Sequence, residues 1–202
     1  MVARSQVDWM TEAGMFFEKT GPVWETLRAL EQSLEEAGID YVVIGGLALN
    51  AHDYPRQTID VDVVLTREGY EEFKRRLGGS RYPRASTGGR RNQYVNPDTE
   101  VTIDVLVAGG VAGNRRKNST VLFPDPAESE RHGDIRTVSL ARLIELKLVT
   151  WRYKDWGDVV ELIRRHKLAE DFADQLDPVV RTAYGECYDQ ARDEIYEGPQ
   201  LD

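Results

Sequence analysis

Two short hydrophobic runs in this sequence are each interrupted by aspartate. Residues 58–65 read TIDVDVVL and residues 101–107 read VTIDVLV. Their β-branched residues are typical of buried strands. Alternate side chains of a strand point to the same face, so Asp60 and Asp62 are expected side by side on a central strand. Two ionised carboxylates so placed repel each other and resist desolvation, and a bound divalent cation removes both penalties.

Magnesium suits these acids, because it takes hard oxygen ligands from a few carboxylates and from substrate phosphates; Mn²⁺ is the alternative. Asp104 interrupts the second run and becomes a third ligand if its strand pairs beside that of Asp60. The other interpretation is that Asp60, Asp62 and Asp104 lie at strand ends, where they reach solvent or cap loops. The apolar setting of all three favours the metal site.

Periodicity, capping residues and turn residues predict the other elements. They are helices at about 22–37, 47–52, 66–77, 139–151 and 154–166, a strand at 41–44, and a hairpin that pairs 94–95 with 101–107. Their order predicts an α/β (α+β) fold in which a small mixed sheet is flanked by helices.

The length of 202 residues fits one domain with a helical appendage. The net charge of −9 is concentrated in residues 169–202, which hold ten acidic residues against two basic ones. We therefore predict a body of residues 1–168 and an acidic helical C-terminal extension, 169–202, packed on it. The nearly neutral body neither favours nor excludes a polyanionic partner.

Several protein classes are excluded. A single cysteine, Cys187, cannot form an internal disulfide and leaves too few thiols for a cysteine-based metal site. The first 17 residues have no apolar segment of the signal-peptide type, and no apolar run approaches the ~20 residues that cross a bilayer. A cytoplasmic protein with no membrane partner is expected.

Gly45 and Gly46 follow the strand at 41–44 and precede a short helix. Backbone N–H groups at such a glycine turn can bind a phosphate. The simpler alternative is a tight strand-to-helix turn.

Together these features resemble a known signature. Gly45-Gly46, a spacer of thirteen residues, Asp60-Val61-Asp62 and the later Asp104 resemble the nucleotidyltransferase pattern. The string GGLALNAHDYPRQTIDVDVVL, with Arg56 and Thr58 ahead of Asp60, is similar to the minimal nucleotidyltransferases of the AbiEii/MenT toxin type. The segment SLARLIELKLVTWRYKDWGDVVEL resembles their Lys…Arg-x-Lys-Asp…Asp helices. The resemblance covers about residues 38–165.

The resemblance implies a function. A metal-dependent nucleotidyltransferase would move a nucleoside monophosphate from an NTP to a hydroxyl of a tRNA, another RNA or a protein, as a component of a toxin–antitoxin pair with a cognate partner protein. Gly45 and Gly46 would hold the triphosphate, with Arg56 and Thr58 in the nucleotide site. Asp60 and Asp62 would bind the metals, and Asp104 would be the third ligand or the base for the acceptor hydroxyl. The alternatives are a non-catalytic binding or regulatory protein of the same fold, and a structural domain with an accidental Asp-x-Asp.

Lys147 lies on an apolar helical stripe with Leu140, Ile144 and Trp151. A cation there needs a partner, because an unpaired buried charge is costly. A substrate phosphate is one partner; a salt bridge to Asp155 or Asp158, or exposure to solvent, is the alternative.

Arg56 could bind phosphates through its planar guanidinium group or lie exposed on the surface. The basic loops at 84–91 and at Arg115-Arg116-Lys117 could contact an RNA backbone or only solvent. The three histidines have no metal-ligand spacing and are given no role. They are His52, His132 and His166.

Overall fold

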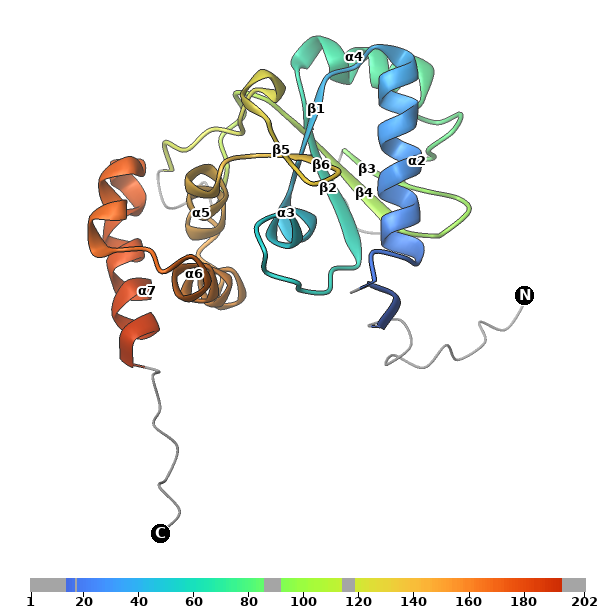
Figure 1. Cartoon of the computed structure of the whole chain (residues 1–202). Helices are drawn as coiled ribbons and strands as arrows, with labels where there is room; N and C mark the ends of the chain where they lie inside the picture. The colour runs from blue at the N-terminus through green and yellow to red at the C-terminus, as the bar shows by residue number, and fades with distance from the viewer. Residues whose placement is uncertain (1–13, 17, 86–91, 114–118, 194–202) are drawn as a thin grey trace.

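The computed structural model describes residues 14–16, 18–85, 92–113 and 119–193. Its centre is a six-stranded mixed sheet in the order β3-β4-β2-β1-β6-β5 (Figure 1). The strands are β1 (Tyr41–Ile44), β2 (Asp60–Leu65), β3 (Gln93–Val95), β4 (Thr102–Val107), β5 (Glu130–His132) and β6 (Ile135–Thr137). The pairs β2–β4 and β1–β6 are parallel, and the other neighbours are antiparallel.

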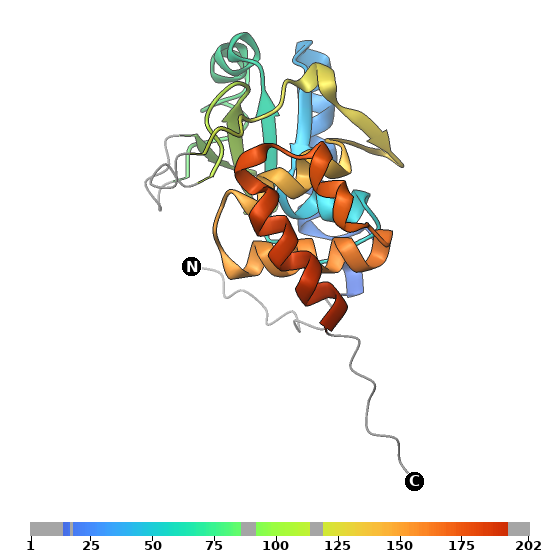
Figure 2. The ribbon, with the colours of Figure 1, turned by 90° about the vertical axis from the view of Figure 1, so that its left-hand side faces the viewer.

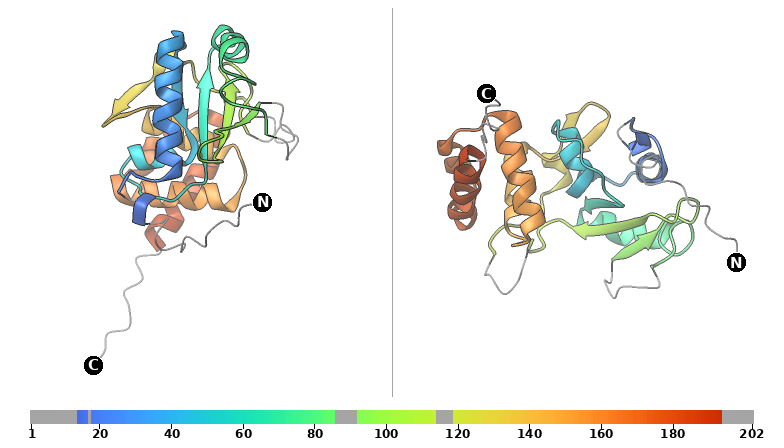
Figure 3. Two further views of the ribbon diagram at one scale, coloured as in Figure 1. Left: turned by 90° about the vertical axis from the view of Figure 1, so that its right-hand side faces the viewer. Right: turned by 90° about the horizontal axis from the view of Figure 1, so that it is seen from below.

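Helices cover both faces of this sheet. On one face lie α2 (Pro22–Ala37) and α4 (Arg67–Arg76), and on the other α5 (Leu140–Leu148) and α6 (Tyr153–His166). The short α3 (Gly45–Ala51) leads off the end of β1. Outside α6 lies α7 (Arg181–Asp193), which Figure 2 shows in front and Figure 3 shows as the outermost layer seen from below.

The alternation of side chains along the central strands separates two hydrophobic clusters. Val61 and Val63 of β2 pack with α2 and α4, whereas Val64 packs with α5 and α6. On β4, Ile103 belongs to the first cluster and Leu106 to the second. Residues two apart share a face, so the face toward α5 and α6 also carries the aspartates at 60, 62 and 104.

The expected α/β architecture is confirmed, and so are several local signals. The helix at 22–37 and the strand at 41–44 have the predicted bounds. Thr66 Oγ1 accepts a hydrogen bond from Gly69 N at 2.9 Å, and Ser139 Oγ accepts one from Arg142 N at 3.3 Å, so both residues cap helices. The hairpin of β3 and β4 is antiparallel as predicted.

Other boundaries differ for local reasons. The short helix begins at Gly45, two residues early, because the φ of +70° at Gly45 turns the chain directly out of β1. The helix predicted to reach 151 ends at Leu148, and Trp151 adopts a left-handed φ of +57°. The β5–β6 hairpin was not predicted, since three exposed or half-buried residues, Glu130–His132, carry no apolar signal.

The acidic extension contributes to the second cluster. Short 3₁₀ turns at Glu170–Gln175 and Pro178–Val180 lead into α7. Tyr184 and Cys187 of α7 are buried in the same cluster as α5 and α6. The division into 1–168 and 169–202 stays a prediction.

Candidate active site

Three carboxylates meet at one end of the two central parallel strands. Asp62 of β2 lies opposite Asp104 of β4, and Asp60 lies opposite Thr102. Carboxylate oxygens of Asp60, Asp62 and Asp104 all lie within 4.8 Å of one another. The convergence expected from the sequence is therefore present. It follows from the register of β2 and β4.

The three charges oppose one another. Burial, followed by the charges of Asp60 and Asp104, raises the pKa of Asp62 to about 7, against the opposing effect of Lys147 and Arg152. The Asp62 side chain keeps part of its surface open to a cleft, and protein atoms surround the rest. Clustered oxygen donors suit Mg²⁺ or Mn²⁺, so the residues fit the implied metal.

Both glycines are required by this packing. A Cβ on Gly45 would lie 2.0 Å from Asp62 Oδ2, and one on Gly46 would lie 2.5 Å from Thr58 Cβ. At these distances a side chain at either position would displace Asp62 or Thr58. The glycine pair therefore has a structural cause beside the aspartates, and its contact with a phosphate stays a prediction.

Thr58 acts on the first aspartate. Its Oγ1 donates a 2.5 Å hydrogen bond to Asp60 Oδ1. This hydrogen bond fixes the direction of the Asp60 carboxylate. Thr58 is thus a positioning residue for Asp60, and its predicted contact with a nucleotide is not tested.

Lys147 lies in a buried charge network on α5 and α6. Its Nζ is 3.1 Å from Asp155 Oδ1 and 2.9 Å from Asp158 Oδ2, and all three side chains are at most 8% exposed. Burial alone would raise the pKa of Asp155, but Lys147, Thr150 and Arg152 outweigh it and lower that pKa. The salt bridges considered from the sequence are therefore formed. A phosphate contact of Lys147 stays a prediction.

Two arginines complete the network. Arg56 Nη1 lies 2.9 Å from Asp158 Oδ2, and Arg152 Nε lies 2.5 Å from Asp155 Oδ2. Arg56 thus ties the loop before β2 to α6, whereas the Arg152 side chain is 64% exposed.

A cleft of about 570 Å³ separates the carboxylates from the start of α6. Its lining includes Asp62 and Asp104 of the two strands and Thr150 and Arg152 of the α5–α6 connection. A cation facing acids across such a cleft suits a ligand that carries both phosphates and a metal ion. Sequence reasoning did not single out Arg152, although it lies in the quoted Arg-x-Lys-Asp run.

The histidines, which were given no role, are neighbours in space. The rings of His52 and His132 are 4.3 Å apart and those of His52 and His166 are 6.4 Å apart. His52 Nε2 lies 2.8 Å from the Val138 carbonyl oxygen, and His166 Nε2 lies 2.9 Å from the His52 carbonyl oxygen. In the described part of the chain, these residues form no metal-ligand group of three. They link α3, the β5–β6 hairpin and α6.

The basic loops fall mostly outside the described residues. Arg115, Arg116 and Lys117 lie there, as do residues 86–91. The Arg84 guanidinium stacks over the Tyr94 ring at 5.7 Å. Their predicted contacts with RNA are not tested.

Within the described ranges, every helix is too short or too polar to cross a membrane. No family model matches this sequence, and no curated protein does. Among solved structures, the chain is similar to an antigenic nucleotidyltransferase-like protein from Paracoccidioides brasiliensis. The identity is 15% and the TM-score 0.48, over 82% of this chain and 86% of that chain. A likeness at this level assigns no residue a role.

Proposed function

We propose that this protein is a metal-dependent nucleotidyltransferase, which transfers a nucleoside monophosphate from an NTP to a hydroxyl group. The observation that carries the proposal is the convergence of Asp60, Asp62 and Asp104 within 4.8 Å, beside a cleft that Asp62 and Asp104 line. Three acids so close need a cation, and phosphate oxygens complete its coordination.

In this mechanism Asp60, Asp62 and Asp104 would hold Mg²⁺ or Mn²⁺, which would supply neutralisation of phosphate charge and a lower pKa for the attacking hydroxyl. The acceptor oxygen forms a bond to the α-phosphorus, the bond from the α-phosphorus to the bridging oxygen breaks, and pyrophosphate leaves. The hydroxyl proton passes to Asp104 or to water.

The cations of the neighbouring network would orient the triphosphate. Arg152 faces the carboxylates across the cleft and would contact phosphate oxygens directly. Lys147 is buried in the same network, where it pairs with Asp155 and Asp158, and it contributes positive potential at Asp62. Gly45 and Gly46 would let the chain approach the phosphates closely. This division of roles rests on positioning and charge, the main contributions in phosphoryl transfer.

The acceptor would be an RNA, such as a tRNA, or a protein hydroxyl. The resemblance of the motifs to AbiEii/MenT-type toxins supports a place in a toxin–antitoxin pair, with a cognate protein as inhibitor. A non-catalytic protein of the same fold would bind the same ligands without transfer.

Two experiments test the proposal. Calorimetry with ATP, GTP, CTP and UTP, each with and without Mg²⁺, should show nucleotide binding that requires the metal. Incubation with labelled NTPs, total tRNA and lysate protein should then transfer label to one of them, and Asp62→Asn should abolish the transfer. Binding of all four NTPs without metal, or no binding, contradicts the proposal, whereas binding without transfer identifies the non-catalytic alternative.

A further inference from the structure

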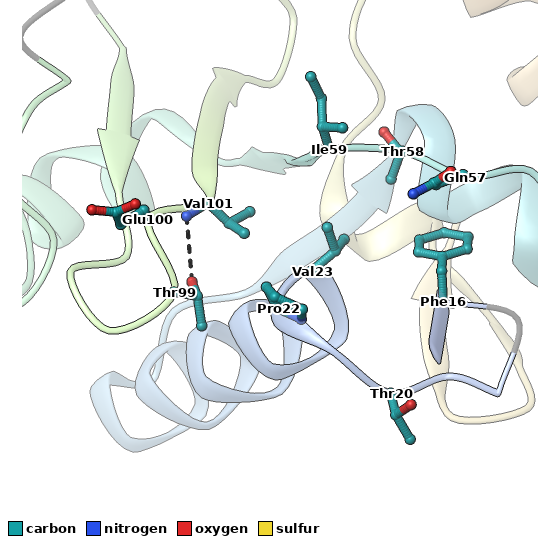
Figure 4. Close-up of a pocket in the computed structure, with 10 residues that line it drawn as sticks. All are labelled: Phe16, Thr20, Pro22, Val23, Gln57, Thr58, Ile59, Thr99, Glu100 and Val101. Atoms are coloured by element: carbon teal, nitrogen blue, oxygen red, sulfur yellow. Dashed lines mark hydrogen bonds between the residues drawn. The ribbon is translucent and has the colours of Figure 1, made fainter. Parts of the chain in front are cut away.

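A second cavity lies beside the starts of β2 and β4, on the face of the sheet that α2 covers. Its volume is about 170 Å³, and it lies between the start of α2, the segment before β2 and the β3–β4 turn (Figure 4). Phe16, Val23, Ile59 and Val101 give it apolar walls. Figure 4 shows Thr20 and Glu100 pointing away from the enclosed space.

The cavity is connected to the candidate active site through two strands. Ile59 directly precedes Asp60, and Val101 directly precedes Thr102, which is the register partner of Asp60. Because side chains alternate along a strand, Ile59 and Val101 point to the opposite face from Asp60. Thr58 lines the cavity, and its hydroxyl donates a hydrogen bond to Asp60. Thr58 therefore touches both the cavity and the first of the three carboxylates.

The size and chemistry of the cavity indicate its occupant. A dry cavity of about 150 Å³ accepts benzene, so this one accommodates a single six-membered ring. Gln57 offers an amide donor and acceptor at its edge, and Thr58 Oγ1 keeps lone pairs that can accept a further bond. Ile59 is 80% exposed, and a flat ring would cover it. Apolar walls together with several polar groups, among them Gln57, Thr58 and Thr99, suit a nucleobase better than a phenol, which has a single polar atom.

From this geometry we infer that the cavity binds the terminal pyrimidine base of an RNA acceptor and places its ribose hydroxyl at Asp60. The inference rests on the proposed function and names the acceptor of the same site. The pyrimidine ring packs against Phe16 and Val23, and Gln57 contacts its polar edge. The acceptor thus enters from the α2 side of the sheet, opposite the cleft that Arg152 lines.

Ligand-observed NMR on the full-length, metal-free protein tests the inference. Cytidine, uridine, adenosine and phenol serve as probes. The pyrimidine nucleosides should bind in a saturable way, and Val23→Phe, which fills the cavity, should weaken their binding at least tenfold. Val179→Phe makes the same change at a site that is 37% exposed in the C-terminal extension and should leave binding unchanged.

A second variant tests the cavity without changing the packing of the hydrophobic core. Gln57 is exposed, so Gln57→Ala should fold normally and weaken cytidine binding about three- to tenfold, the value of one hydrogen bond, without affecting phenol. Binding of phenol alone overturns the inference in favour of an aromatic side chain of a protein acceptor. No binding of any probe, or adenosine binding as tightly as cytidine, also overturns it.

Two further measurements separate this inference from the function it rests on. Asp62→Asn should retain cytidine binding. Cytidine binding to the cavity can therefore be measured even if the protein neither binds metal nor transfers nucleotides. A non-hydrolysable CTP analogue with Mg²⁺ should not displace cytidine. Displacement would place the base of the donor nucleotide in this cavity and overturn the acceptor assignment.

Discussion

Two clusters of charge lie close together on the same side of the sheet and differ in composition. In the network on α5 and α6, Lys147, Arg56 and Arg152 meet two acids, Asp155 and Asp158. The cluster on β2 and β4 consists of three acids. Among the described residues, no salt bridge of lysine, arginine or histidine reaches its members Asp60 and Asp62.

The difference is visible in the pKa values. Cations lower the pKa of Asp155, whereas burial and neighbouring acids raise that of Asp62 to about 7. The network is complete within the protein and holds α5, α6 and the loop before β2 together. The proposed metal ion would complete the carboxylate cluster. We therefore expect the network to determine stability and the carboxylate cluster to determine binding and catalysis.

The largest effect on stability is expected from Lys147→Met. The substitution leaves Asp155 and Asp158 buried without their shared cation, which should cost about 3–5 kcal/mol of unfolding free energy. Urea denaturation measures this loss. Lys74→Met is the control, because Lys74 is half-buried at the surface and its partner Glu71 is exposed, so the change should alter stability by no more than about 1 kcal/mol. Equal losses would show that the network is no more stabilising than a surface pair.

The next effect concerns catalysis. Replacing Asp60, Asp62 or Asp104 with Asn should lower the rate of nucleotidyl transfer at least about 100-fold, or about 2.7 kcal/mol, because each change removes a charged metal ligand. Single-turnover assays with saturating NTP and Mg²⁺ measure the rate. A variant at Asp60 or Asp62 that retains more than a tenth of the parent rate would exclude that residue as a ligand.

A smaller effect is expected at Gly45. Its φ of +70° is close to the +66° of Gly38, but a Cβ at Gly38 meets nothing within 4 Å, whereas one at Gly45 displaces the Asp62 carboxylate. Both alanine variants should lose about 1 kcal/mol of stability through backbone strain. Only Gly45→Ala should also weaken Mg²⁺ binding, by about tenfold, as calorimetry would show. Equal Mg²⁺ affinities would remove Asp62 from the metal site.

The smallest effect concerns pH. Burial lowers the pKa of His52 below its ordinary value of 6.5, with further lowering by His132 and His166. The unfolded chain then binds a proton more readily than the folded protein, so stability should decrease as the pH falls below about 6.5. His52→Gln should reduce this dependence. Thermal melts between pH 5 and 8 would contradict the prediction if parent and variant changed in parallel.

The sequence was most informative where local chemistry decides the structure. The alternation in TIDVDVVL placed Asp60 and Asp62 on one face, and Thr66 and Ser139 cap helices as their positions indicated. Features that depend on distant segments could not be predicted. The three histidines meet because α3, β5 and α6 converge, and the position of Arg152 across the cleft depends on how α6 packs against the sheet.

Two backbone features, the close packing at Gly45 and the β5–β6 hairpin, also could not be predicted from local sequence. Position 45 has no room for a side chain because the carboxylate of Asp62, seventeen residues later in the sequence, lies against it. The β5–β6 hairpin consists of two three-residue strands, and β5 has no hydrophobic residue to mark it.

Thermal melting of the three Asn variants without metal tests the central claim most directly. If Asp60, Asp62 and Asp104 are metal ligands, each replacement relieves repulsion in the metal-free protein. We predict melting temperatures at or above that of the parent, together with loss of the stabilisation that Mg²⁺ gives the parent. If these acids instead stabilise the fold through buried ion pairs, each replacement leaves a cation without its partner and costs about 3–5 kcal/mol. A large fall in the melting temperature of all three variants would contradict the account.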